Sequence, residues 1–145
     1  SVLLYTVSFD LVKNRFQTLH VTDTGSKTKS LLLDDEIGFS GSGSKYRFVN
    51  MMPNVAKVDL YFGTTLMQTG IPYLGSSSYF EMAVPPASQA WTIRETGTSP
   101  TSTALATYTS ANTYIIGRVY TTFASGYKGQ TATATRPYIS FLLNK

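Results

Sequence analysis

The stretch from Lys45 to Gly63 constrains the fold more than any other part of the chain. Apolar and polar residues alternate along both of its halves, 46–50 and 56–62. A period of two residues places alternate side chains on opposite faces of a β-sheet. Pro53 and Asn54 favour a turn between the halves, and Gly63 ends the second half. The stretch therefore predicts two consecutive strands joined by a Pro-Asn turn.

Short runs of the same kind recur along the chain at spacings of about ten residues, which is typical of an antiparallel β-sandwich. The further strands that we expect span 2–11, 16–23, 30–33, 79–84, 91–95, 103–109, 112–123 and 137–143. The run 112–123 is apolar on both faces, which predicts a central position in a sheet. We interpret 40–44 as a loop within one domain, with a domain boundary as the alternative, and 68–78 as mostly loop.

The composition of the 145 residues agrees with one all-β domain, because aromatic residues make up 13% and charged residues only 14%. The net charge is +4, but the basic residues are scattered, which argues against a nucleic-acid interface. The chain has no cysteine, so disulfides, thiolate nucleophiles and cysteine metal sites are excluded. No apolar run reaches the ~18 residues of a transmembrane segment. We expect no cofactor.

Several short motifs, taken together, resemble those of one protein family. They are Arg47-Phe48-Val49-Asn50, Pro53-Asn54, Val58-Asp59-Leu60-Tyr61, Trp91-Thr92-Ile93-Arg94 followed by Gly97, Tyr114-Ile115-Ile116-Gly117, and the spaced tyrosines Tyr73 and Tyr79. The family that they resemble is DUF4397, a group of bacterial cell-envelope lipoprotein domains of the Bacteroidetes type. The similarity covers roughly residues 45–123, and Met51-Met52 departs from the small residues usual in the family's turn.

The resemblance implies an immunoglobulin-like β-sandwich exported to the cell envelope, as an outer-membrane lipoprotein or a periplasmic or surface-exposed domain. A lipid anchor would then precede Ser1. The resemblance implies no activity, because none is established for the family. We expect a single domain over 1–145, with a family-like core at about 45–123 and the N-terminal strands within 2–39 packed on it.

Asp59 lies in the middle of a predicted strand, where an aspartate is disfavoured. A buried carboxylate needs compensating partners. The candidates are Arg47 on the preceding strand and the backbone donors of the Pro53-Asn54 turn. We expect the Asn50 side chain to stabilise this turn. We interpret this motif as structural, with ligand binding by Asp59 as the alternative. The residues assigned to it are Arg47, Asn50, Pro53, Asp59 and Gly117.

Catalytic and metal-binding residues are not expected. The single histidine, His20, is interpreted as a half-exposed strand residue rather than a catalytic base. The stretch 38–42 has Ser42 where a nucleophile elbow requires Gly, and no helix follows it. Asp34, Asp35 and Glu36 are adjacent, so on a strand they would not point the same way; we expect a solvated turn rather than a calcium site.

Trp91, Tyr79 and Tyr73 are the candidates for ligand binding. Exposed aromatic rings on a flat sheet can stack on sugars, whereas the favoured interpretation of Trp91 is that it packs between the sheets. We therefore expect a non-catalytic cell-envelope module for adhesion, assembly or ligand display, with an envelope protein or a polysaccharide as partner. The alternative is a carbohydrate-binding module that uses exposed aromatics. A hydrolase comes third, because no nucleophile–base pair is visible.

Overall fold

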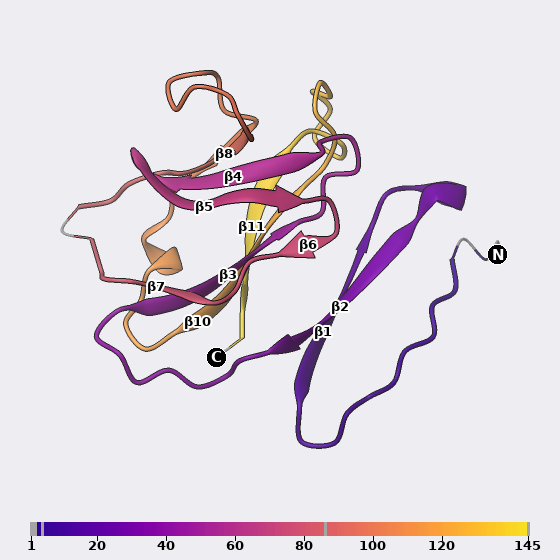
Figure 1. The fold of residues 1–145 in the computed structure, drawn as a ribbon, viewed down its shortest axis with the longest axis horizontal. Helices are drawn as coiled ribbons and strands as arrows, with labels where there is room; N and C mark the ends of the chain where they lie inside the picture. Colours follow the sequence, from indigo (N-terminus) through magenta and orange to yellow (C-terminus); the bar gives the residue numbers. More distant parts are fainter. Residues whose placement is uncertain (1–2, 4, 86, 145) are drawn as a thin grey trace.

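The computed structural model describes residues 3, 5–85 and 87–144 and is built almost entirely from strands (Figure 1). The strands are β1 (Phe16–Thr22), β2 (Lys29–Asp35), β3 (Ser44–Asn50), β4 (Lys57–Phe62), β5 (Thr65–Pro72), β6 (Gly75–Ser76), β7 (Phe80–Met82), β8 (Trp91–Glu95), β9 (Ala106–Tyr108), β10 (Val119–Ser125) and β11 (Tyr138–Leu143). Two 3-10 turns, η1 (Gly25–Lys27) and η2 (Ala111–Thr113), complete the described elements. The predicted all-β class is confirmed. In these ranges no helix has the length and hydropathy to span a membrane.

Two sheets pack face to face in a sandwich-like arrangement. One has the strand order β11-β10-β3-β6, with β7 also pairing with β3, and the other has the order β5-β4-β8-β9. Neighbouring strands are antiparallel except β3 and β10, which run parallel. The predicted central position of the strand near 112–123 is confirmed, because β10 lies between β11 and β3. This strand begins only at Val119, since Gly117 occupies a turn with a φ of +77°.

The segment between β3 and β4 carries the chain from one sheet to the other. Pro53 and Asn54 form the expected turn, but β3 and β4 do not pair with each other, because they belong to different sheets. Crossing between sheets lets the apolar faces of both strands point into one core. Asn50 ties the crossover: its Oδ1 accepts from the Met52 N–H at 3.0 Å, and its Nδ2 donates to the Ile71 carbonyl at 3.1 Å.

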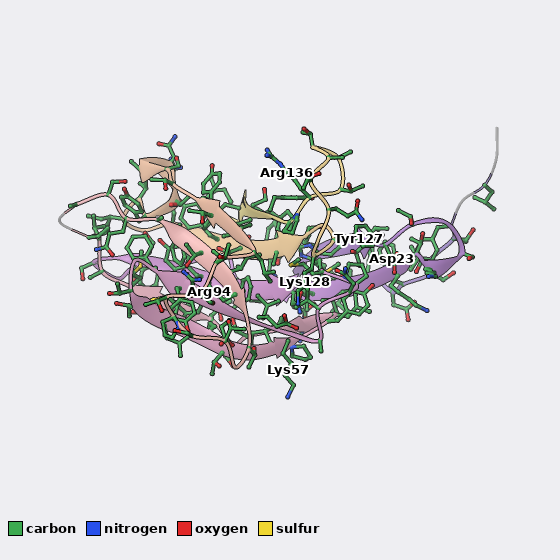
Figure 2. The ribbon with its side chains drawn as sticks, turned by 90° about the horizontal axis from the view of Figure 1, so that it is seen from above. Asp23, Lys57, Arg94, Tyr127, Lys128 and Arg136 are labelled. Atoms are coloured by element: carbon green, nitrogen blue, oxygen red, sulfur yellow. The ribbon has the colours of Figure 1, made fainter. Side chains whose placement is uncertain are left out.

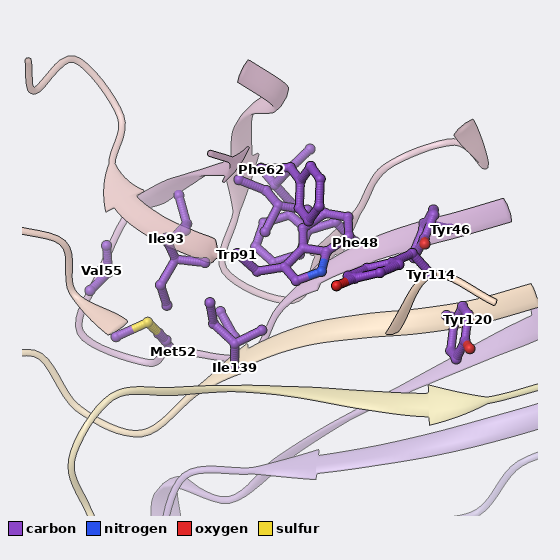
Figure 3. Packing of buried hydrophobic residues seen from close by; sticks show 14 residues of the cluster. Tyr46, Phe48, Met52, Val55, Phe62, Trp91, Ile93, Tyr114, Tyr120 and Ile139 are labelled. Atoms are coloured by element: carbon purple, nitrogen blue, oxygen red, sulfur yellow. The ribbon is translucent and has the colours of Figure 1, made fainter. Parts of the chain in front are cut away.

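The core between the sheets is centred on Trp91, which is fully buried (Figure 3). Its indole ring lies 4.7 Å from the ring of Phe62 and 5.1 Å from that of Tyr46, measured between centroids. The indole N–H donates to Thr113 Oγ1 at 3.0 Å. A buried indole needs such a partner for its N–H. The favoured interpretation, that Trp91 packs between the sheets, is confirmed.

The β1–β2 hairpin lies against the outer face of β3 and β10, beside the two sheets (Figure 1). The His20 ring meets Phe123 of β10 edge-on, with centroids 5.7 Å apart. The Thr22 hydroxyl donates to the Met51 carbonyl at 2.6 Å. This third layer explains why β3 is buried on both of its faces, since residues such as Arg47 and Val49 point away from the core.

Two expectations about individual segments are wrong. No strand is found within 5–11, although the alternation predicted one over 2–11; Val2 and Leu4 lie outside the described residues. The run 68–78, expected to be mostly loop, contains much of β5, which pairs with β4 through register shifts near Leu60. Pro72, which has no backbone N–H, is tolerated because β5 is an edge strand.

Candidate functional site

A surface hollow with a volume of about 570 Å³ lies between β9 and β11. Its lining residues come from the edge strands of the two sheets and from the loop 126–137. They are Leu105, Ala106, Thr107, Tyr108, Gln130, Thr131, Arg136, Pro137, Tyr138 and Ile139. We call this hollow the β9–β11 groove.

The groove forms because the two sheets do not join along this side. β9 ends one sheet and β11 ends the other, and no ladder connects them. The rings of Tyr108 and Phe141 lie 5.4 Å apart, so side-chain packing rather than backbone pairing closes the seam. The open side of the seam is then walled by the loop that joins β10 to β11.

The loop 126–137 is held by contacts to three other parts of the chain. Figure 2 shows Tyr127 of this loop beside Asp23. The Tyr127 hydroxyl donates to Asp23 Oδ1 at 2.8 Å, and the Lys128 N–H donates to Asn54 Oδ1 at 2.9 Å. Lys128 also forms an ion pair with Glu95 of β8. At the base of the loop, the Tyr127 N–H donates to the Thr135 carbonyl at 2.8 Å. A wall anchored this way keeps the groove preformed, as ligand sites usually are.

The chemistry of the groove is that of aromatic and neutral polar groups. Tyr108 and Tyr138 are 38% and 42% exposed. Thr107, Thr131 and Gln130 add two hydroxyls and an amide, which both donate and accept hydrogen bonds. Arg136 is the only charged residue of the lining, and Figure 2 shows its side chain projecting outward from the loop. Without a carboxylate the lining has no general acid or base of the glycosidase kind.

The aromatic residues predicted to bind a ligand do not form a common platform. Trp91 is buried in the core, so a sugar cannot stack on it, and this part of the carbohydrate-platform interpretation is wrong. Tyr79 is half-buried, and the guanidinium of Arg47 lies 5.0 Å from its ring centroid. Tyr73 is also half-buried, and burial raises the pKa of its hydroxyl.

The three adjacent acidic residues pair with three different basic residues. Asp34 pairs with Arg15, and Glu36 pairs with Lys45. Asp35 pairs with Arg47, and only this pair is buried. Hydrogen bonds from Arg15 and Gln17 lower the pKa of the Asp34 carboxyl. Within 5–85 and 87–144, no three metal-ligating side chains converge.

Asp59 is buried as expected, but its partners are not those expected. Its Oδ1 accepts from the Thr69 hydroxyl at 2.9 Å, the Gly70 N–H at 2.7 Å and the Thr96 hydroxyl at 2.6 Å. Arg47 lies in the other sheet and pairs with Asp35 instead. The compensation therefore comes from β5 and from Thr96, which follows β8, rather than from the Pro53-Asn54 turn.

His20 and Gly117 also differ from expectation. His20 is buried rather than half-exposed, and its Nε2 has no hydrogen-bond partner in the described part of the chain. Desolvation lowers the pKa of its imidazole, the charge of Arg47 lowers it further, and Asp35 partly opposes both effects. Gly117 lies in a turn rather than in a strand, and its N–H donates to the Gly43 carbonyl at 2.8 Å.

Sequence reasoning missed the β9–β11 groove. The alternation predicts Tyr108 on one strand and Tyr138 on another, but it does not show that these two strands border the same seam. The available signal was the low apolarity of 124–135, which marks a surface loop. It did not indicate which strands the loop covers.

The fold and the groove define the class of this protein as an all-β, sandwich-like domain with a preformed polar surface groove. No protein-family model matches the chain, and the comparison with curated proteins finds no relative.

Proposed function

We propose that this domain is a non-catalytic adhesion module that binds polysaccharide in the β9–β11 groove. The observation that carries the proposal is the pair of exposed tyrosines, Tyr108 and Tyr138, on the two edges of one preformed hollow. Sugar rings present apolar C–H faces and a rim of hydroxyls. Exposed aromatic rings offer apolar area at low conformational cost, and neighbouring polar groups fix the orientation of the ligand.

The remaining lining supports a saccharide over other ligands. Gln130, Thr107 and Thr131 match hydroxyl groups, because each can donate and accept. Arg136 makes the groove compatible with neutral or acidic sugars, since no carboxylate of the lining repels an anion. The groove lacks the two carboxylates of a glycosidase, which supports binding rather than hydrolysis.

The location that we propose is the cell envelope, as an outer-membrane lipoprotein, periplasmic or surface-exposed domain. The motifs shared with DUF4397 support this proposal, and an immunoglobulin-like classification of the sandwich is proposed on the same ground. Arg47, Asn50, Pro53 and Asp59 then act as structural residues, in agreement with the contacts of Asn50 and Asp59.

Affinity electrophoresis tests the proposal, with native gels that contain dextran, mannan, xylan or alginate. We expect at least one polysaccharide to retard the wild-type protein. Tyr108→Ala and Tyr138→Ala should each weaken the affinity about tenfold, which corresponds to ~1.4 kcal/mol. Phe9→Ala is the matched control, because Phe9 is 45% exposed and does not line the groove. Unchanged mobility in all four gels would contradict the proposal, as would equal retardation of the tyrosine variants.

A further inference from the structure

Residues 5–12, which we call the N-terminal arm, have the pattern of a strand but pair with no strand in the part of the chain that the structure describes. Tyr5, Val7, Phe9 and Leu11 alternate with polar residues up to Asp10. Among the described residues, no backbone N–H of 5–11 donates a hydrogen bond. Extended chain with unpaired backbone groups is a template for pairing with another strand.

Two hydrogen bonds connect the described part of the arm to the β1–β2 hairpin. The Tyr5 hydroxyl lies 3.0 Å from Ser30 Oγ on β2, and the Val12 N–H donates to Gln17 Oε1 on β1 at 3.2 Å. Between these contacts the arm is open to solvent, since Phe9 is 45% and Leu11 78% exposed. Figure 1 shows the arm running alongside the hairpin, on the side away from the two sheets.

The arm reaches the hairpin through a tight turn at Lys13 and Asn14. The Arg15 N–H donates to the Val12 carbonyl at 3.2 Å, and Asn14 has a φ of 62°. Left-handed backbone is uncommon for a residue other than glycine, although asparagine tolerates it better than most. An extended Asn14 would relieve this conformation and would join the arm to β1 as one continuous strand.

We propose that two copies of this chain exchange their N-terminal arms, each arm packing on the β1–β2 hairpin of the other copy. Exchange of an identical element remakes between copies the contacts that it makes within one chain, so both hydrogen bonds of the arm are kept. Among the described strands β1 and β2 pair with no third strand, so the hairpin of the other copy also offers a free edge on which the unpaired backbone of the arm could add as a strand.

The exposed apolar side chains support a second copy as the occupant. Leu11, Val12 and Phe16 flank the hinge on both sides and are 78%, 47% and 59% exposed. In a two-fold exchanged dimer the two hinge segments cross, so these side chains of one copy meet those of the other. Burial of this apolar surface favours the dimer. The proposal does not depend on the β9–β11 groove.

A matched pair of hinge variants tests the proposal. A tethered arm has an effective concentration in the millimolar range, so the wild type should be largely monomeric at micromolar concentration and should dimerise as its concentration approaches millimolar. Proline cannot adopt a φ of 62°, so Asn14→Pro should be a dimer already at micromolar concentration. Asn14→Gly accepts the turn freely and should shift the wild-type equilibrium toward monomer. Light scattering after size-exclusion chromatography measures each mass.

Cross-linking provides a second readout that leaves the hinge intact. The chain has no cysteine, so Tyr5→Cys/Ser30→Cys places two unique thiols at the arm contact. At high protein concentration, a short bismaleimide should link the two cysteines between two chains. At low concentration it should link them within one chain. Each single-cysteine variant is the control. A monomeric Asn14→Pro variant would overturn the proposal. Cross-links confined to single chains at every concentration would overturn it as well.

Discussion

Arg47 of β3 and Asp35 of β2 form a buried ion pair that joins the N-terminal hairpin to the sandwich. Arg47 Nη2 lies 2.5 Å from Asp35 Oδ1, and the two side chains are only 5% and 7% exposed. The same nitrogen donates to Thr121 Oγ1 at 3.0 Å, and Nη1 donates to the Asp34 carbonyl at 2.6 Å. One guanidinium therefore bridges β2, β3 and β10.

Removing Arg47 should strongly destabilise the domain. Arg47→Ala leaves Asp35 buried without its partner, which should lower the free energy of unfolding by roughly 3–5 kcal/mol. Urea denaturation measures the loss. Asp35→Ala should have an effect of similar size, and the double variant should be less destabilised than the sum of the two.

A second double variant supplies the control. Arg47 and Asp59 lie in different sheets and share no hydrogen-bond partner, so Arg47→Ala and Asp59→Ala should be additive. Strong coupling between Arg47 and Asp59, or additivity between Arg47 and Asp35, would show that the pairing described above is wrong.

Asp59 should matter as an acceptor rather than as a charge. Asp59→Ala removes the acceptor of three donors from Thr69, Gly70 and Thr96, and should cost about 3 kcal/mol in the free energy of unfolding. Asp59→Asn keeps Oδ1 and should cost only about 1 kcal/mol. Equal losses in urea melts of the two variants would contradict this interpretation.

His20 should make stability depend on pH in the mildly acidic range. Burial lowers the pKa of His20 in the folded state, so the unfolded chain binds the proton more readily. The stabilising contribution of neutral His20 is therefore complete above the unfolded pKa of about 6.5 and is lost as the pH falls below it. We expect the melting temperature to fall from pH 7 to pH 5 by a smaller amount in His20→Gln than in the wild type. Equal falls would exclude His20 as the cause.

Gly126 should be required for the wall of the β9–β11 groove. A Cβ at this position would lie 2.1 Å from the Arg136 carbonyl oxygen, and the φ of +89° already disfavours any side chain. Gly126→Ala should destabilise the domain by roughly 2–3 kcal/mol and weaken polysaccharide retardation. Gly129→Ala is the matched control, because Gly129 has a φ of +88° but open space around its Cβ. Gly129→Ala should lower the free energy of unfolding by only about 1 kcal/mol, because the positive φ is its only unfavourable feature. Equal losses in thermal melts would exclude the clash.

The sequence predicted individual strands well where one face is apolar. The alternation of Tyr46 and Phe48, and of Val58 and Leu60, predicted β3 and β4 with their core-facing sides, and all four residues are buried in the core. The same rule failed for 5–11, because alternation is a property of the segment alone, whereas a strand also requires a partner. Edge strand β5 was missed because its Gly and Pro residues hide the pattern.

The partners of buried polar residues, like the strands, could be predicted only in part from the sequence. That a buried Asp59 needs compensation could be argued from its place between apolar neighbours, but its donors come from Thr69, Gly70 and Thr96, which a register shift and a strand pairing bring to it. Tyr108 and Tyr138 were visible in the sequence only as members of two separate strands. Their meeting on one groove depends on which strands end the two sheets.

The sequence by itself determined the all-β class and the position of most strands, because side-chain period and turn chemistry are local properties. Tertiary structure alone decided that β3 and β4 belong to different sheets, that β3 runs parallel to β10, and that Arg47 pairs with Asp35. These choices depend on contacts between residues far apart in the chain. This arrangement of strands is stabilised because it buries both faces of β3 at once, which no local sequence pattern predicts.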